Sequence, residues 1–255
     1  DRTKKKWPDL EALLADKSSL LIVLQNNTDP DAIASAAALR ALAHKVAESL
    51  QCSLACGDGI GRAENRALVR YLNLNIRPAG KVNAEPFDLL ALVDTQPGHG
   101  NTSLPEGADI DIVIDHHPLR DEARAAAFRD VRRRYGATSS IFFEYLLAAD
   151  IQPDPPLATA LVYGIRSDTQ DLGRDTSAAD VNAYEALYPL ANKRMLAVIQ
   201  RGQVPTAYFQ MLARALGNAF LCGRSIYSRL ESVENADMIA EVADLMLRHE
   251  QADCS

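Results

Sequence analysis

The feature that most constrains this chain is a series of short apolar segments that each end abruptly in polar side chains. Residues 110–114 form one such segment, and the sequence Asp-His-His follows it at residues 115–117. Comparable segments at residues 20–24 and 89–93 are also followed by acidic groups. A β-branched apolar run of this length is typical of a buried strand, and its polar end is typical of a strand tip that carries functional groups.

Helix-forming segments separate the expected strands. Residues 32–50 are mostly Ala, Leu and Val without Gly or Pro, and Asp31 is placed to cap a helix there. We expect further strands at residues 52–56 and, at a sheet edge, 126–131, and further helices at residues 63–72, 137–149, 156–167, 178–190 and 192–203. This alternation predicts an α/β fold with a doubly wound, mostly parallel sheet and helices on both faces.

The length of 255 residues accommodates one full domain and a smaller piece. We expect a first domain at residues 1–190, a helical linker at 191–222 and the beginning of a second α/β domain at 223–255. A strand expected at 226–233 and a helix expected at 236–249 cannot form a stable core by themselves, so the second domain would be incomplete in this sequence. The basic N-terminal residues are expected to form a solvated arm.

Composition and charge disfavour several classes of protein. The net charge of −7 argues against a surface for duplex nucleic acid, although metal ions can still attract a small phosphorylated ligand. No apolar run approaches the length of a membrane span and no signal peptide is evident, so we expect a cytoplasmic protein without a membrane partner. The four scattered cysteines are expected to be reduced thiols, because their spacing matches neither a zinc site nor a disulfide framework.

The acidic groups that follow the apolar segments predict a metal site. Asp29 and Asp31 follow the first expected strand, and Asp94 follows the third. Residues 115–117 follow the fourth, and Asp168 ends an apolar helix. Groups beyond the carboxyl ends of parallel strands gather in one crevice, and crowded carboxylates there need cations, which nearby Lys and Arg do not supply. Carboxylates with imidazoles favour Mn²⁺ or Mg²⁺ over a metal that prefers thiolates.

Each of these groups, taken alone, also fits a structural role. Asp29 and Asp31 flank a proline in a sequence that is typical of a turn and a helix cap. Asp94 fits a strand end, and Asp168 fits a cap of the segment that follows. The Asp-His-His sequence fits such a role less well, because adjacent polar groups after a fully apolar strand need partners. The order of all four clusters therefore favours a metal site.

The four polar segments resemble motifs of the DHH phosphoesterase superfamily. This superfamily includes RecJ-type exonucleases, family II pyrophosphatases, oligoribonuclease/phosphoadenosine phosphatase proteins and cyclic-di-AMP phosphodiesterases. The resemblance covers about residues 18–190, and its motifs are residues 27–35, 92–95, 113–118 and 164–169. Residues from about 205 onward resemble the start of a DHHA1-type substrate-binding domain, whose glycine-rich motif with a histidine is not present in this sequence.

The resemblance implies two metal ions, with Mn²⁺ expected and Mg²⁺ as the alternative. The implied ligands are Asp29 and Asp94 for the first ion, and Asp31, Asp94, His116 and Asp168 for the second. His117 would contact the scissile phosphate, and Asp115 would orient a histidine from outside the ligand set. A hydroxide bridging the ions would attack phosphorus, and His117 would stabilise the developing charge.

One position departs from the pattern of the family. The resemblance implies a histidine four residues before Asp29 as a ligand of the first ion, and this chain has Gln25 there. A glutamine oxygen can ligate, but it is neutral and binds Mn²⁺ more weakly than imidazole does. Two functions therefore follow: a metal-dependent phosphoesterase, or a catalytically weakened or inactive nucleotide-binding regulatory module of the same fold.

The expected substrates are small phosphoesters: short single-stranded oligonucleotides, 3′-phosphoadenosine nucleotides or cyclic dinucleotides. Three side chains are candidates for contact with them, and each has a structural alternative. Ser139 opens a helix, where its segment either binds a phosphate or simply caps the helix. Arg166 either binds a phosphate or pairs with a surface acid, and His99 either reaches substrate or is solvated in its loop. The sequence is compatible with a homodimer.

Overall fold

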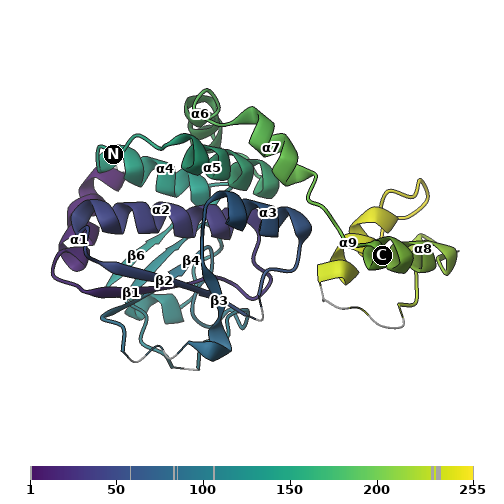
Figure 1. The fold of residues 1–255 in the computed structure, drawn as a ribbon, viewed down its shortest axis with the longest axis horizontal. Coiled ribbons are helices and arrows are strands. Elements are labelled where there is room, and N and C mark those ends of the chain that lie inside the picture. Colours follow the sequence, from purple (N-terminus) through teal and green to yellow (C-terminus); the bar gives the residue numbers. More distant parts are fainter. Residues whose placement is uncertain are drawn as a thin grey trace.

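The protein is built around a six-stranded parallel sheet in the computed structural model (Figure 1). The structure describes residues 2–57, 59–82, 84, 86–105, 107–230, 233 and 237–254. The strands follow the order β3-β2-β1-β4-β5-β6, and neighbours in that order pair in parallel. Their bounds are β1 Ser19–Val23, β2 Gln51–Cys56, β3 Ile76–Pro78, β4 Leu89–Val93, β5 Ile112–Asp115 and β6 Phe128–Val131.

The direction in which the chain moves across the sheet reverses between β1 and β4. From β1 the chain moves outward to β2 and β3, and from β4 it moves the other way to β5 and β6. The central position of β1 and β4 follows from their continuous apolar sequences, which suit strands that are covered on both faces. The segments that leave the carboxyl ends of these two strands diverge, and the crevice between them is where open parallel sheets bind ligands.

α helices cover one face of the sheet (Figure 1). Three of them, α2 (Pro30–Val46), α4 (Thr138–Ala148) and α5 (Pro155–Asp168), pack against one another, and α1 (Arg2–Ala15) and α3 (Ala63–Tyr71) flank them. The small side chains of α2 permit close approach, and most of its alanines are buried in the main hydrophobic core.

Loops and short 3₁₀ helices cover the opposite face. The 3₁₀ helices η1 (Ala79–Lys81) and η2 (Glu122–Ala125) add Ala79 and Ala123 to a second, smaller core under the sheet. The connection from β4 to β5 is rich in glycine and proline, which disfavour a longer helix. The predicted α/β fold with a doubly wound, mostly parallel sheet is confirmed, with α helices on one face and 3₁₀ helices on the other in the described ranges. The short edge strand β3 was not predicted.

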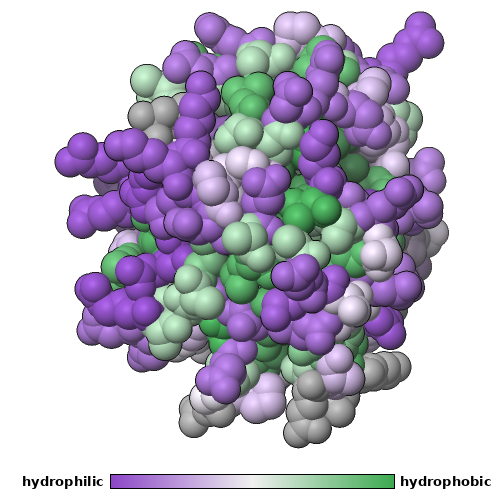
Figure 2. Space-filling view, turned by 90° about the vertical axis from the view of Figure 1, so that its left-hand side faces the viewer, coloured by the Kyte–Doolittle hydropathy of each residue, from purple (hydrophilic) through white to green (hydrophobic). Residues whose placement is uncertain are grey.

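The N-terminal segment corrects one expectation. It forms α1 instead of a solvated arm, because an apolar stripe of Trp7, Leu10 and Leu14 packs into the main core. Lys6 Nζ also donates a hydrogen bond at 2.6 Å to the carbonyl oxygen of Arg129 in the edge strand β6. Figure 2 shows the side of the molecule where α1 lies, with hydrophilic side chains spread between smaller apolar groups.

The C-terminal part of the chain has a small core of its own. After α6 (Ala178–Leu187) and α7 (Lys193–Gln200), an extended segment leads to this part in Figure 1. Its elements are α8 (Thr206–Gly217), β7 (Phe220–Cys222), β8 (Ser225–Tyr227) and α9 (Asp237–Met246). The side chains of Met211, Ala215, Ile226, Val242 and Met246 form its core. The division of the chain at residues 190 and 222 stays a prediction.

The strand predicted at residues 226–233 is present only in part. β8 ends at Tyr227, residues 228–230 are not in a strand, and residues 231, 232 and 236 of the predicted strand and helix lie outside the described residues. β7, which was not predicted, pairs with β8 through a tight turn in which Gly223 has φ +62°. No helix within the described ranges has the length and apolar character needed to cross a membrane, and no disulfide links the described cysteines.

A buried ionic cluster fixes the edge of the sheet to the helical layer. Asp130 in β6 has no exposed side-chain surface and lies 2.6 Å from the guanidinium of Arg132, which in turn lies 2.6 Å from Glu144 of α4. Tyr145 donates to Asp130 at 2.7 Å, and Arg2 of α1 pairs with it at 2.6 Å. Burial alone would raise the pKa of Asp130, but these partners outweigh burial and hold that pKa below its ordinary value.

Replacing Asp130 with asparagine is expected to lower the free energy of unfolding by about 3 kcal/mol, because the buried Arg132 guanidinium loses part of its compensating charge. Urea unfolding at neutral pH measures the loss, and Asp9→Asn on the exposed side of α1 is the matched control. Because the pKa of Asp130 is lowered on folding, the wild type should lose this stabilisation as the pH falls below about 4. Equal stability of the two variants at neutral pH would contradict this account of the cluster.

Candidate metal centre

Four of the predicted side chains meet beside the crevice between β1 and β4. Asp31 comes from the start of α2, Asp94 from the end of β4, His116 from just after β5, and Asp168 from the end of α5. One ligand atom from each residue lies within 4.8 Å of those of the other three. His116 Nε2 is 3.2 Å from Asp168 Oδ2 and 3.5 Å from Asp94 Oδ1. The chain therefore brings together residues that are far apart in sequence, as predicted.

Asp94 lies at the centre of the site in a strained backbone conformation. Its φ is +58°, in the left-handed region that few residues other than glycine adopt. Its amide donates to the carbonyl oxygen of Ile114 at 3.0 Å, and its buried carboxylate accepts a hydrogen bond from the Thr138 hydroxyl at 2.8 Å. Such conformations cost about 1–3 kcal/mol and persist where the surroundings dictate them, commonly at functional sites.

The start of α2 corrects the expected helix cap. Asp29, not Asp31, is the N-cap residue, and its carboxylate accepts a hydrogen bond from the amide of Ala32 at 2.9 Å. Asp31 is the second residue of the helix and is fully buried. It accepts from the amides of Thr138 at 2.6 Å and Ser139 at 2.8 Å, at the N-terminal end of α4, where the helix dipole favours an anion. Asp31 therefore binds the first amides of α4 and does not cap α2.

Ser139 and Gly164 support this carboxylate from two helices. The predicted contact of Ser139 with substrate remains a prediction, but its amide is engaged by Asp31 and its side chain is buried. Gly164 of α5 lies directly against these groups. A Cβ atom there would lie 2.4 Å from Ser139 Oγ and 3.0 Å from Asp31 Oδ1. Only glycine permits this approach of α5 to α2 and α4, so the close contact explains the glycine.

His116 is oriented toward the carboxylates by a backbone contact. Its Nδ1 lies 3.1 Å from the carbonyl oxygen of Tyr135, which assigns the ring proton to Nδ1 and leaves Nε2 facing Asp94 and Asp168. Nε2 is buried and makes no well-formed hydrogen bond within the described residues. Burial would lower the pKa of His116, but Asp168 and Asp31 outweigh it and raise that pKa to about 9.

The carboxylates destabilise one another in this environment. The pKa of Asp29 is raised to about 6, mainly by burial and to a lesser extent by the neighbouring charge of Asp31. Burial and the charge of Asp168 raise the pKa of Asp31 to about 6, and burial with the other acids raises the pKa of Asp94 well above its ordinary value. A set of crowded carboxylate oxygens around one imidazole nitrogen matches the ligands of Mn²⁺ or Mg²⁺. The residues therefore fit a divalent cation between Asp31, Asp94, His116 and Asp168.

Asp115 is placed to orient His117. Its Oδ1 lies 2.8 Å from His117 Nδ1 and also accepts from the amides of His116 and His117. Its Oδ2 accepts from Gln96 Nε2 at 2.6 Å. Burial would raise the pKa of Asp115, but His117 and Gln96 outweigh it and hold that pKa low, so the residue stays an anion. Sequence reasoning missed Gln96, although its position two residues after Asp94 was a signal.

The side chains around the implied first ion are less suited to a cation than those around the second. Gln25 Nε2 donates to Asp29 Oδ2 at 2.8 Å and lies 3.5 Å from Asp94 Oδ2. The side-chain oxygen of Gln25, Oε1, accepts from Asn101 Nδ2 at 3.1 Å, a contact that sequence reasoning also missed. An amide nitrogen cannot ligate a cation, so in this arrangement the residues around Asp29 fit an ion less well than those around His116 do.

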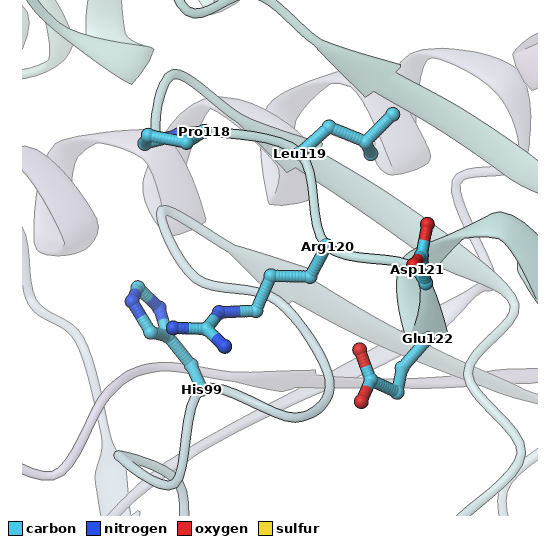
Figure 3. Close-up of a pocket in the computed structure, with 6 residues that line it drawn as sticks. All are labelled: His99, Pro118, Leu119, Arg120, Asp121 and Glu122. Carbon is cyan, nitrogen blue, oxygen red and sulfur yellow. The ribbon is translucent and has the colours of Figure 1, made fainter.

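A cavity of about 450 Å³ adjoins the cluster and is lined by His99 and residues 118–122 (Figure 3). The His99 and His117 rings lie 5.7 Å apart, edge to face. Figure 3 shows the Arg120 side chain extending toward His99, and none of the ion pairs within the described ranges involves Arg120. Sequence reasoning missed Arg120. Arg166 instead pairs with Asp171 at 2.6 Å, which is the structural alternative stated for it.

Fold and site together define an α/β protein with a candidate divalent-metal centre where the strand order of a parallel sheet reverses. Comparison with known families then identifies the family. The pattern described as DHH family, N-terminal domain, matches residues 19–165, and the chain belongs to this family. The resemblance inferred from the four motifs is thereby confirmed.

Two relatives extend the comparison. The chain is 35% identical over 250 residues to a Methanocaldococcus jannaschii protein described as uncharacterized protein MJ1633. The match covers 97% of this chain and 51% of that protein, so the chain spans about half the length of the relative. The crystal structure of an exopolyphosphatase-related protein from Bacteroides fragilis matches with a TM-score of 0.73, over 97% of this chain and 77% of that one. At 13% identity, this second likeness shows the fold alone.

Without divalent cations, the melting temperature should rise as the pH is lowered from about 8 to about 5. Asp29 and Asp31, each with a pKa raised to about 6, bind protons more tightly in the folded state than in the unfolded chain. Their stabilising effect is present below the unfolded pKa and is lost as the pH rises through 6. His116, with its pKa raised to about 9, acts in the same direction between pH 6.5 and 9.

With saturating Mn²⁺ the trend should reverse, because the cation competes with protons for the same groups and stabilises the folded state more at higher pH. Thermal scans in EDTA and in Mn²⁺ across this range compare the two conditions. Identical pH dependence with and without the cation would show that these groups do not form a metal centre.

Proposed function

We propose that this chain is the catalytic part of a metal-dependent phosphoesterase that hydrolyses small phosphoesters. The observation that carries the proposal is the convergence of His116 with the carboxylates of Asp31, Asp94 and Asp168, each of which places a ligand atom within 4.8 Å of the others. Membership of the DHH family supports the same class of reaction. Mn²⁺ is the proposed cation and Mg²⁺ the alternative, because the ligand set combines hard oxygens with one imidazole.

The residues around the cluster divide the work of the reaction. Divalent cations held here would lower the pKa of water and offset charge on the phosphoryl group. Asp115 holds Nδ1 of His117 and leaves its Nε2 available at the half-exposed edge of the site. From there His117 can donate a hydrogen bond to a phosphoryl oxygen as negative charge develops. Gln96 fixes the carboxylate of Asp115 and thereby the direction of the His117 ring.

The cavity beside His117 supports a substrate with a second anionic group. Arg120 and His99 line that cavity, and Nδ1 of His99 has no hydrogen-bond partner within the described residues. A guanidinium that lacks an acidic partner is suited to a phosphate. We therefore favour a phosphorylated nucleotide or a short single-stranded oligonucleotide with a terminal phosphate, and the net charge of −7 disfavours long duplexes.

The second candidate function is a nucleotide-binding regulatory module that hydrolyses nothing. Gln25 favours it, because its amide nitrogen faces Asp29 and Asp94 where an imidazole ligand would be expected from the family. A chain with one weak ion position would bind nucleotides through the remaining cation and turn over slowly or not at all.

Hydrolysis of bis(p-nitrophenyl) phosphate and of the dinucleotide pApA in Mn²⁺ separates the two functions. We expect the wild type to hydrolyse both, and His116→Ala to lower kcat/KM by at least about 100-fold, because it removes a direct ligand. His44→Ala, on the exposed surface of α2, is the matched control and should retain wild-type activity. Background rates in wild type and His116→Ala alike would favour the regulatory module.

Arg120→Ala should raise KM for pApA by about 10-fold with little change in kcat, because one charge-assisted contact to the terminal phosphate is lost. The same substitution should leave the kinetics of ApA, which lacks that phosphate, unchanged. Arg70→Ala in the last turn of α3 is the charge-matched control. An equal loss with both dinucleotides would show that Arg120 does not read the terminal phosphate.

A further inference from the structure

We propose that Gln96 is a positioning residue that holds the cavity beside His99 in register with His117, so that a substrate is cleaved one nucleoside away from its terminal phosphate. The contact of Gln96 with Asp115 already belongs to the proposed reaction. The inference adds the contacts that the same residue makes to the two loops that line the cavity. It rests on the phosphoesterase function proposed above, and on neither the number nor the position of the cations.

The Gln96 side chain is almost fully buried and joins two loops. Its Nε2 donates to Asp115 Oδ2 at 2.6 Å and to the carbonyl oxygen of Pro118 at 3.1 Å. Its Oε1 accepts from the backbone amide of Arg120 at 2.9 Å. One side chain thus connects the loop after β4 with the last residue of β5 and with two points of the loop that follows β5.

The partners of Gln96 determine which way its amide points. A backbone amide such as that of Arg120 can only donate, and a backbone carbonyl such as that of Pro118 can only accept. Exchanging the nitrogen and oxygen of the Gln96 amide would therefore break the hydrogen bonds on both sides. The side chain has one orientation, in which both N–H groups and the oxygen are engaged.

The backbone of Gln96 holds the other side of the cavity. Its carbonyl oxygen accepts from the amide of His99 at 3.3 Å, across a turn in which Gly98 has φ +75°. Figure 3 shows His99 and Arg120 on separate loops, with their side chains extending toward each other. Gln96 therefore contacts both loops, through its backbone on the His99 side and through its side chain on the Arg120 side.

The same side chain determines the direction of His117. Gln96 binds Oδ2 of Asp115, and Oδ1 of that carboxylate lies 2.8 Å from Nδ1 of His117. The His117 ring lies 5.7 Å from the ring of His99, so it adjoins the cavity. Gln96 therefore fixes the distance between His117, which is placed to stabilise the reacting phosphate, and Arg120, which is placed to bind the terminal one.

A fixed distance between these two groups selects substrates by the spacing of their phosphates. In pApA one nucleoside separates the terminal phosphate from the scissile phosphate, whereas ApA has no terminal phosphate. Binding of a remote group increases the rate only when it also aligns the reacting group. Through Gln96, binding of the terminal phosphate at Arg120 aligns the scissile phosphate with His117.

Gln96→Met tests this role, because methionine fills a similar volume but offers no N–H group. We expect kcat for pApA and ApA alike to fall by at least about 10-fold, because a small displacement of His117 is costly. The preference for pApA over ApA in kcat/KM should also fall by about 10-fold, to the value of Arg120→Ala. Adding Arg120→Ala to Gln96→Met should then change the preference by less than about twofold.

The ratio of the two rates separates positioning from loss of stability. Destabilisation alone lowers the amount of active enzyme and leaves the preference for pApA unchanged. Asn65→Leu is the matched control, because Asn65 is also a buried amide, and its Nδ2 donates to the carbonyl oxygen of Thr28 at 2.8 Å, outside the cavity. Gln96→Asn is the milder variant: its amide is one methylene shorter and cannot reach Asp115 and Arg120 together, so it should lose the preference as well.

Binding of 5′-AMP and of adenosine, followed by NMR titration in EDTA, tests the cavity without turnover. The wild type should bind 5′-AMP about 10-fold more tightly than adenosine, and Gln96→Met should lose this difference while Asn65→Leu retains it. Equal affinities of the wild type for the two ligands would overturn the inference.

A preference for pApA that survives in Gln96→Met and Gln96→Asn, or that falls equally in Asn65→Leu, would also overturn the inference and leave the proposed function intact. Effects of Gln96→Met and Arg120→Ala on the preference that simply add would have the same meaning. Absence of hydrolysis by the wild type, together with the predicted loss of 5′-AMP binding in Gln96→Met, would instead refute the proposed function and retain the role of Gln96 in the cavity.

Discussion

The mutual repulsion of buried acidic side chains around His116 is the constraint on which the rest of this structure depends. Asp31 and Asp94 are fully buried, and burial raises the pKa of each. A folded protein tolerates such a group only when donors or cations compensate it. The amides of Thr138 and Ser139 donate to Asp31 and the Thr138 hydroxyl donates to Asp94, but on the inner side of the cluster Asp94 and Asp168 share only Nε2 of His116 among the described residues. A divalent cation fits that requirement.

The architecture brings these groups together at a cost in backbone strain. The reversal of strand order opens the crevice, α4 directs its first amides into it, and Gly164 lets α5 approach closely enough to add Asp168. Asp94 adopts a left-handed conformation with φ +58°. Helices α2, α4 and α5 pack into one core with the sheet, so the scaffold is rigid where the ligands arise. The packing of the helices on the sheet thus offsets the backbone strain at Asp94 and the repulsion among the acidic side chains.

The fold, and the side chains that meet at the candidate metal centre, were predictable because their signals are local. Continuous apolar runs identify β1, β4 and β5, and the polar residues that follow them identify the site. The start of α2 shows a feature that local sequence signals do not predict. Pro30 at the first helical position marks Asp29 as the cap, whereas the partner of Asp31, the amide of Thr138, lies 107 residues away and has no local signal.

The supporting contacts were not predictable for the same reason. Gln96, Asn101 and Arg120 are ordinary loop residues by composition, and only tertiary structure shows that they touch Asp115, Gln25 and the cavity beside His99. The basic N-terminus was misread because its charges were weighed above the apolar stripe of α1. The most direct measurement of the central claim is an anomalous-difference map of crystals soaked in Mn²⁺. The account predicts a peak bound by Asp31, Asp94, His116 and Asp168 together, and a map without a peak among these four side chains would contradict it.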